Sequence, residues 1–430
     1  MAKQTTDTMK TVEGRGMVNF GKEFTAEELG VIAEEAVNLP RVPRRIPFPS
    51  HGSRLNIWKQ DPSVERLGAR QIYLHTRTRQ GPRDSQINIS GMPTVYPDFK
   101  GDFLVDPQDE AEFDAVHTYA VVRMVLTMYQ RALREKMSWH WGDSEPIDVN
   151  PRAGSAANAF YSRTGKSLRF FFFRKAGADP SEPPIYTCRS LDIVAHEAGH
   201  AILDGLKSEW LPFTQPQTGG LHESFGDLTA IFLALSQLDL VEFVIASTKG
   251  NLHRTNILDK LAEQFGEGIG RPSGLRNADN DLKLSQVSNQ VHDLSQVFTG
   301  AVFDILATAF HAARRPRWID DAIMLYEVGQ KVMKLTLEGI RLAPAQNATY
   351  KDVADAMIAF ANSHPVEFDG YDQIIQAEFT RREVLGTAAA AAPTPIDGMG
   401  LDYGACCGTM HHLAEEEEAI AEFGPLREVG

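Results

Sequence analysis

The pattern of hydrophobic and polar residues changes character near the middle of the chain. Short apolar runs separated by Gly and Pro, typical of strands, recur between residues 55 and 103 (RQIYLHT, SQINIS, DFLVD), at 158–161 and at 168–174. Long helical periodicity predicts one helix over 110–136. Later periodic segments predict five more helices, at 223–238, 296–313, 319–337, 350–361 and 371–384. The pattern therefore predicts an α+β protein whose strands precede residue 190 and whose helices dominate after it.

A helix that is apolar nearly all round is predicted over 190–203, and it carries His196-Glu197-Ala198-Gly199-His200. Residues i and i+4 of a helix lie on one face, so both imidazoles can point at a single metal ion. Glu197 would then stand beside a metal-bound water and act as a general base. The alternative is a chance HExxH on a solvated helix face. The apolar flanks favour burial instead, and buried histidines need partners, of which zinc is the simplest.

A catalytic zinc site needs a third protein ligand. A third histidine in the pattern HxxGxxH is excluded because Leu203 and Leu206 stand where Gly and His would be, and the two later cysteines lie in the tail. A carboxylate remains. Glu223 opens the next predicted helix, and Asp227 follows one turn later, where it could orient a ligand histidine. Glu223 could instead be an acid in the first turn of its helix, where the helix dipole favours negative charge. The neighbouring His222 is expected to face solvent.

From about residue 109 to residue 384 the chain resembles the thermolysin-like family of zinc metallopeptidases, within the gluzincin group. The segment SLDIVAHEAGHAI is similar to the family's active-site helix, and ESFGD at 223–227 matches its ExxxD segment. The resemblance implies one zinc ion held by His196, His200 and Glu223, with Glu197 as the base and Asp227 behind the ligands. It also implies a two-lobed fold, in which a β-rich N-terminal lobe and a helical C-terminal lobe meet at the HExxH helix.

The same resemblance assigns substrate contacts. The side chain of Asn158 and the backbone of Ala159 match the family's edge strand, which holds the substrate peptide as an added strand. Arg276 matches an arginine that binds a substrate carbonyl, and His292 matches a histidine that stabilises the tetrahedral intermediate. The residues allow simpler interpretations: a turn-forming asparagine, a surface arginine and a histidine hydrogen-bonded at a helix start.

Two expected partners of these groups are missing from the sequence. Val287 stands where the family carries an aspartate that charges its catalytic histidine, and the nearby candidates for a substitute are Asp279, Asp281 and Asp293. The family also has a tyrosine between HExxH and the third ligand that helps to bind the oxyanion, whereas no tyrosine occurs here between residues 186 and 326. The transition-state donors are therefore expected to be fewer than in the family.

A structural calcium site is doubtful on sequence grounds. Asp192 matches one ligand of the family's double-calcium site, but Ala234 stands where another acid is expected. Asp192 could serve only as a first-turn acid of the HExxH helix.

Composition limits the partners and the compartment. The 430 residues carry a formal net charge of -14, which argues against nucleic acid as a partner. No apolar run is judged long enough to span a membrane, and the N-terminus has no apolar signal segment. Three cysteines cannot form a disulfide framework. A cytoplasmic location is favoured and export by a non-standard route stays open, while the oligomeric state is not predicted.

The chain divides into five predicted segments. They are an N-terminal arm (1–50) with one helix near 26–37, an N-terminal α/β lobe (51–189), the HExxH helix (190–209), a C-terminal helical lobe (210–385), and a linker with an acidic tail (386–430).

These observations predict a zinc metalloendopeptidase that acts on a peptide or protein substrate. Ile193 and Leu275, by their match to the family's S1′ pocket, suggest a preference for an apolar residue after the scissile bond. Two other readings stay open. One is a zinc-binding homologue with weak activity, and the other is a narrow-specificity processing peptidase whose tail restricts access.

Overall fold

The computed structural model describes residues 52–62, 67–175, 177–211, 213, 215–270 and 274–386. Internal contacts divide the chain after Ser50, and every described residue belongs to the second unit. The predicted N-terminal arm with its helix, and the tail beyond Gly386, lie outside the described residues.

The strands form small sheets. β1 pairs with β2, β7 with β8 and β9 with β10, all antiparallel. The largest sheet has the order β3-β4-β6-β5, in which β5 is an edge strand and runs antiparallel to β6. The bounds are β1 Ser53–Trp58, β2 Ala69–Leu74, β3 Ile87–Ile89, β4 Ile147–Asn150, β5 Ala159–Ser162, β6 Ser167–Phe170, β7 Phe172–Phe173, β8 Ile185–Tyr186, β9 Lys260–Leu261 and β10 Arg276–Asn277.

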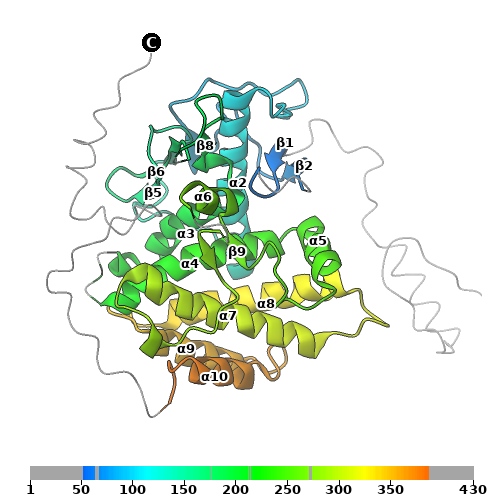
Figure 1. Ribbon diagram of the computed structural model, residues 1–430, viewed down its shortest axis with the longest axis vertical. Coiled ribbons are helices and arrows are strands. Elements are labelled where there is room, and N and C mark those ends of the chain that lie inside the picture. The colour runs from blue at the N-terminus through cyan, green and yellow to red at the C-terminus, as the bar shows by residue number, and fades with distance from the viewer. Residues whose placement is uncertain are drawn as a thin grey trace, which may run out of the picture. The chain divides into compact units, whose positions relative to one another are not determined.

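Helices dominate the second half of the described chain. In Figure 1, α3 and α4 lie between the strands β5, β6 and β8 on one side and the helices α7 to α10 on the other. The bounds are α2 Glu110–Leu133, α3 Leu191–Leu206, α4 Pro216–Leu235, α5 Leu238–Thr248, α6 Glu263–Gly268, α7 Val291–Ala313, α8 Asp321–Leu342, α9 Tyr350–Ser363 and α10 Tyr371–Arg381. The predicted α+β class is thus confirmed at the level of mixed helices and strands.

Helix α4 begins earlier than its sequence suggested. It starts at Pro216, so that Glu223 lies two turns inside it rather than at its first residue. The predicted helix began only after the glycines at 219 and 220, but added Cβ atoms there would meet Val291 and Tyr350. These glycines therefore permit close packing of α4 and do not mark a turn. Proline suits the first helical position because its missing N–H is not needed there.

Other differences concern short or interrupted elements. The helices α5 and α6 were not predicted, and the run DFLVD forms a single bridge between Phe103 and Leu55 instead of a strand. Of four consecutive phenylalanines, Phe170 ends β6, Phe172 and Phe173 form β7, and Phe171 lies between the two strands. Such breaks depend on pairing with distant segments, which periodicity does not report.

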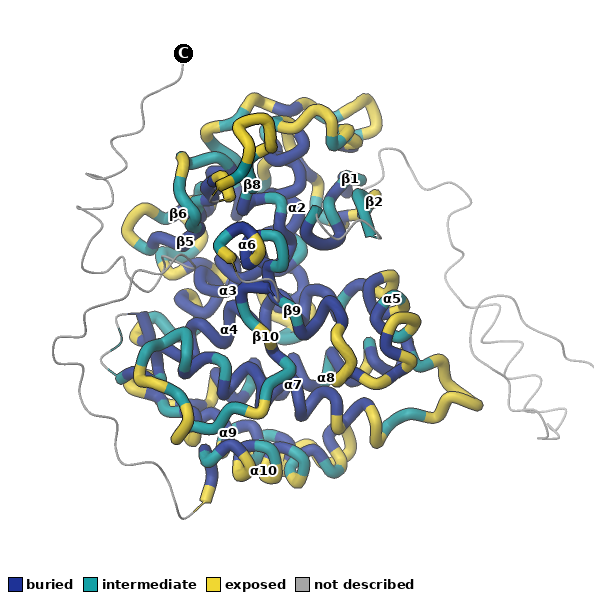
Figure 2. Tube along the Cα trace, viewed as in Figure 1, coloured by how far each residue is buried: buried dark blue, intermediate teal, exposed yellow. Residues whose placement is uncertain are grey.

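The helix that carries HExxH is almost completely buried, as Figure 2 shows for α3 and α4. Ser190 caps α3, and its side chain accepts a hydrogen bond from the N–H of Ile193. Side chains from α2 and α4 also meet near it, where the rings of Tyr129 and Phe225 lie 5.3 Å apart.

Two glycines let α3 and α4 approach each other closely. A Cβ atom on Gly199 would stand 2.6 Å from Thr229 Oγ1, and one on Gly226 would stand 2.6 Å from the imidazole of His196. Neither contact is possible for a larger residue without movement. This close approach sets the position of α4 relative to α3, the helix that carries HExxH.

By length and composition, helix α7 is long and apolar enough to cross a membrane. The expectation that the chain contains no such apolar run was therefore wrong. In the fold, however, 72% of its most apolar window is buried inside the protein. That burial is typical of the core helix of a globular unit.

Candidate metal centre

Three side chains from α3 and α4 converge on one point. His196 Nε2 and His200 Nε2 are 3.0 Å apart, and each lies 3.5 Å from one of the two carboxylate oxygens of Glu223. A tetrahedral ion with ligand bonds of about 2.1 Å would hold its ligand atoms about 3.4 Å apart. The three groups are therefore positioned to hold a metal ion.

The environment of Glu223 supports that assignment. Its side chain is fully buried, and Oε1 has no hydrogen-bond partner among the described residues. Burial alone would raise the pKa of this carboxyl, but His292 and the hydrogen bond with His196 hold the pKa well below its usual range. An ionised, buried carboxylate with an unused oxygen fits a metal cation. The donor set of two imidazoles and one carboxylate is one that zinc accepts.

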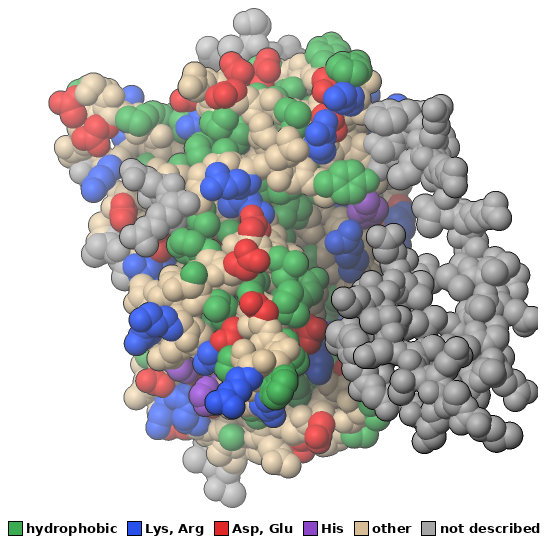
Figure 3. All heavy atoms as spheres, turned by 90° about the vertical axis from the view of Figure 1, so that its right-hand side faces the viewer, with side chains coloured by type: hydrophobic (Ala, Val, Ile, Leu, Met, Phe, Trp, Pro, Cys, Tyr) green, Lys and Arg blue, Asp and Glu red, His purple; other side chains and the backbone are tan. Residues whose placement is uncertain are grey.

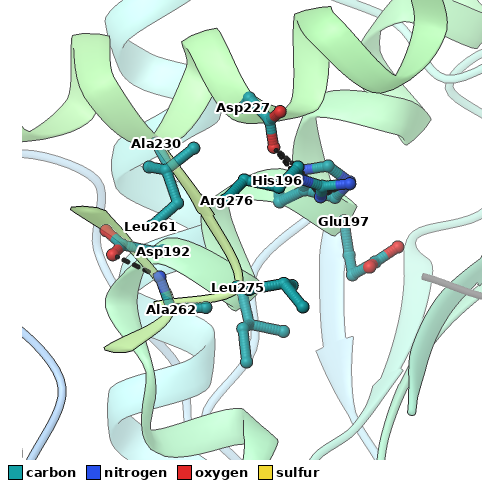
Figure 4. Close-up of a pocket in the computed structure, with 10 residues that line it drawn as sticks. Asp192, His196, Glu197, Asp227, Ala230, Leu261, Ala262, Leu275 and Arg276 are labelled. Carbon is teal, nitrogen blue, oxygen red and sulfur yellow. Dashed lines mark hydrogen bonds and ion pairs between the residues drawn. The ribbon is translucent and has the colours of Figure 1, made fainter. Parts of the chain in front are cut away.

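Asp227 lies behind the first histidine, as Figure 4 shows. Its Oδ1 is 3.0 Å from His196 Nδ1. Burial lowers the pKa of His196, but hydrogen bonds with Asp227 and Glu223 outweigh it and raise the pKa to about 9. When a metal takes the proton's place on Nε2, the contact with Asp227 would keep the remaining proton on Nδ1.

The second histidine has a partner that the sequence did not indicate. His222 was expected to face solvent, but its side chain is completely buried and its Nδ1 lies 2.7 Å from His200 Nδ1. The two rings are nearly parallel, with centroids 4.9 Å apart. Burial lowers the pKa of His222 to about 4 and also holds the pKa of His200 well below its usual value.

Arg276 and His292 reach the same centre from β10 and from the start of α7. Arg276 Nη1 is 3.2 Å from Glu223 Oε2 and 3.1 Å from His292 Nδ1. Its Nε is 2.9 Å from Asp227 Oδ1. The guanidinium of Arg276 and the imidazole of His292 thus both lie beside Glu223. They are suited to binding an oxygen that gains negative charge.

A cavity runs along α3 from this cluster. It is small, about 20 Å³, which is room for about one water molecule, and it is lined by Glu197, the residue after the candidate ligand His196. Ile193 and Leu275, both predicted to contact the substrate, line its wall. Figure 4 shows the lining, which comprises Asp192, Ile193, His196, Glu197, Asp227, Ala230, Leu261, Ala262, Leu275 and Arg276. Most of the wall distant from the ligands is apolar.

The predicted substrate strand is an edge strand in the structure. β5 begins at Ala159 and pairs with β6 alone within the four-stranded sheet. Asn158 precedes it, and its Oδ1 accepts a hydrogen bond from the N–H of Ala159. The end of β5 is tied to α3, because Tyr161 Oη donates to Asp204 over 2.7 Å and Arg163 Nε donates to the same carboxylate over 2.9 Å.

The three aspartates considered as substitutes near Val287 are bound elsewhere. Asp279 lies 2.8 Å from His253, Asp281 accepts from Arg381, and Asp293 accepts from Ser288. The carboxylate next to His292 is the candidate metal ligand Glu223, whose Oε2 is 3.0 Å from His292 Nδ1.

Asp192, the match to a calcium ligand, is a buried residue in the first turn of α3. Its Oδ2 accepts hydrogen bonds from Gln60 Nε2 and from the N–H of Ala262. Burial and the neighbouring carboxyl of Asp61 raise its pKa well above the usual value.

A second group of possible metal ligands consists of His253, Asp279 and Asp304. Asp304 already forms ion pairs with Arg381 and Arg382, so its negative charge is compensated. A divalent cation would be repelled by these arginines, and the group is not a comparable candidate.

On the face shown in Figure 3, acidic and basic side chains of the described residues are interspersed with hydrophobic ones. No family model matches the chain, and no curated protein matches it.

Proposed function

We propose that this protein is a zinc-dependent metallopeptidase with a thermolysin-like, two-lobed architecture. The observation that carries the proposal is the convergence of His196, His200 and Glu223 beside a cavity lined by Glu197. Two imidazoles and a carboxylate favour zinc over calcium or magnesium, which prefer oxygen ligands. Zinc bound there would polarise a substrate carbonyl and acidify a water molecule.

The residues around the ligands have roles that suit hydrolysis of an amide. Glu197 would take a proton from the attacking water and pass it to the leaving amine. Arg276 and His292 would donate hydrogen bonds to the carbonyl oxygen as it becomes negative. The edge strand β5, from Ala159 onward, would pair with the substrate backbone. The apolar side chains of Ile193 and Leu275 favour an apolar residue after the scissile bond.

A test compares cleavage of a peptide with leucine after the scissile bond by the wild type, by Glu197→Gln and by the exposed control Glu327→Gln. We expect Glu197→Gln to lose about 10²–10⁴-fold in kcat while it retains one zinc per chain, because only proton transfer is removed. The control should match the wild type. Equal rates for the wild type and Glu197→Gln would refute the proposed activity.

The second candidate is a zinc-binding homologue with weak activity. Two features of the sequence favour it. Val287 has no carboxylate that could stabilise a protonated His292, and no tyrosine that could bind the oxyanion occurs between residues 186 and 326. In that case the wild type would bind zinc at His196, His200 and Glu223 but would cleave peptides no faster than Glu197→Gln. The idea of a gating tail concerns residues outside the described part of the chain.

A further inference from the structure

His222 makes an unusual contact behind the candidate metal ligands. It directly precedes Glu223 on α4, it is completely buried, and its Nδ1 lies 2.7 Å from His200 Nδ1. We propose that His222 is a positioning residue that holds His200 in the tautomer with a free Nε2, through a hydrogen bond between two imidazoles. The inference rests on the metal-binding part of the proposed function.

The position of the proton follows from the contact itself. Two nitrogens 2.7 Å apart share one proton, because two N–H groups would repel each other and so would two lone pairs. His200 Nε2 faces His196 and Glu223, so a metal there requires this nitrogen to be unprotonated. The proton of His200 is then on Nδ1, which donates to His222 Nδ1. His222 therefore carries its own proton on Nε2.

This arrangement has an energetic cost that would be avoided by other residues. His222 Nε2 is buried and has no hydrogen-bond partner among the described residues. A buried N–H without a hydrogen-bond partner destabilises the native state. An asparagine could accept the same hydrogen bond from His200 through its oxygen. The imidazole instead meets the ring of His200 edge to edge, with 26° between the planes, and so restrains its orientation as well as its tautomer.

The neighbouring carboxylate is already committed to other donors. Asp204 lies one turn beyond His200 on α3, where i and i+4 side chains share a face. It accepts hydrogen bonds from Tyr161 and Arg163 at the end of β5. The common carboxylate–histidine arrangement is therefore formed at His196 with Asp227, whereas His200 is oriented by an imidazole.

The test measures zinc affinity of the full-length chain by competition with a chelator, for the wild type and for His222→Leu, His222→Asn and His117→Leu. His117 is the matched control, because it is also completely buried but hydrogen-bonds to the N–H of Trp58 in another region. We expect His222→Leu to weaken zinc binding about 10–100-fold. His222→Asn should restore most of the affinity, and His117→Leu should lower the melting temperature with an unchanged zinc Kd.

A second readout is the histidine tautomer in the zinc-loaded wild type, from ¹⁵N–¹H correlation spectra of the imidazoles. We expect His200 protonated at Nδ1 and His222 protonated at Nε2. A wild-type zinc Kd in His222→Leu, or a proton on His222 Nδ1, would overturn the inference. If His222→Leu does not fold, the tautomer in the wild type decides the question. Zinc binding with no cleavage would refute the proposed peptidase activity and leave this inference standing.

Discussion

His117 shows how burial of a single side chain couples stability to pH. It is completely buried in α2, and burial lowers its pKa to about 3, from 6.5 in the unfolded chain. When the pH falls through 6.5, the unfolded chain takes up a proton that the native protein does not. The stabilisation is therefore complete above pH 6.5 and is lost progressively towards pH 3.

We expect His117→Gln to reduce that dependence. Glutamine can accept the hydrogen bond from Trp58 but has no proton to gain in this range. Between pH 7 and pH 5, the unfolding free energy of the wild type should fall by about 2 kcal/mol more than that of the variant. Urea denaturation at both pH values measures the difference. Parallel pH profiles would contradict the prediction.

Arg276 combines charge and shape at the ligand cluster. Its guanidinium reaches Glu223, His292 and Asp227 at the same time. We expect Arg276→Lys to retain zinc but to lose about 10²-fold in kcat/KM, because a single ammonium cannot keep the forked geometry. Zinc content and peptide kinetics measured on the same preparation test this. Arg174→Lys, on the exposed surface, serves as the control.

At the level of single residues, the sequence could predict most of the cluster because the spacing within a helix fixes which side chains share a face. His196 and His200 follow from that spacing, and Glu223 follows from chemistry and from elimination. The role of His222 did not follow, because adjacency to a ligand does not report burial. Its burial depends on how α4 packs against α3, which local pattern does not contain.

At the level of elements, the ligand geometry depends on the close approach of α3 and α4. A methyl group on Gly226 would stand 2.6 Å from the imidazole of His196. We expect Gly226→Ala to destabilise the protein by about 1–3 kcal/mol and to weaken zinc binding, because the ring of His196 must move. Thermal unfolding and zinc competition measure the two effects.

Gly329 supplies the comparison for that experiment. It lies in α8, where an added Cβ would stand 3.2 Å from Leu235. This steric conflict is milder than the one at Gly226 and does not involve a candidate ligand. Gly329→Ala should leave the zinc Kd unchanged. An equal loss of zinc affinity in both variants would show that general destabilisation is responsible.

The elements themselves were predicted best where they are long and periodic. The helices α2, α3, α7 and α9 lie close to their expected ranges, whereas α5 and α6 were missed. The start of α4 was wrong because its glycines serve helix packing rather than a turn. Short strands such as β9 and β10 exist only through pairing across the chain, and therefore have no local signature.

At the level of the whole molecule, the proposed metal joins two central helices. We expect removal of zinc by excess chelator to lower the melting temperature, because the native state alone offers the assembled ligands. At a free zinc concentration 100-fold above Kd, the stabilisation is about 2.7 kcal/mol. Differential scanning calorimetry with and without chelator measures it. His200→Ala should melt at the same temperature in both conditions, and a chelator effect of equal size in that variant would contradict the prediction.

The α+β class followed from the sequence because strand-like and helix-like periodicities occupy different parts of the chain. The arrangement of the sheets did not follow. β5 follows β4 along the chain, but β6 lies between them in the sheet and leaves β5 at the edge. Such order is set by contacts between distant segments, which the period of a single run cannot report.

The contact of α3 with α4 also determines how far this protein could be altered by laboratory evolution. Gly199 meets Thr229, whose Oγ1 is 2.7 Å from Tyr129 Oη, and Gly226 meets His196. In a library that randomises these positions together, only combinations that preserve the spacing of the two helices would survive selection for metal content. Ile193 and Leu275, on the cavity wall, are buried apolar residues outside this contact, so their exchange for apolar residues of similar volume would leave the helix spacing intact. Selection for a new substrate can therefore act on the cavity wall, while the interhelical glycines stay constant.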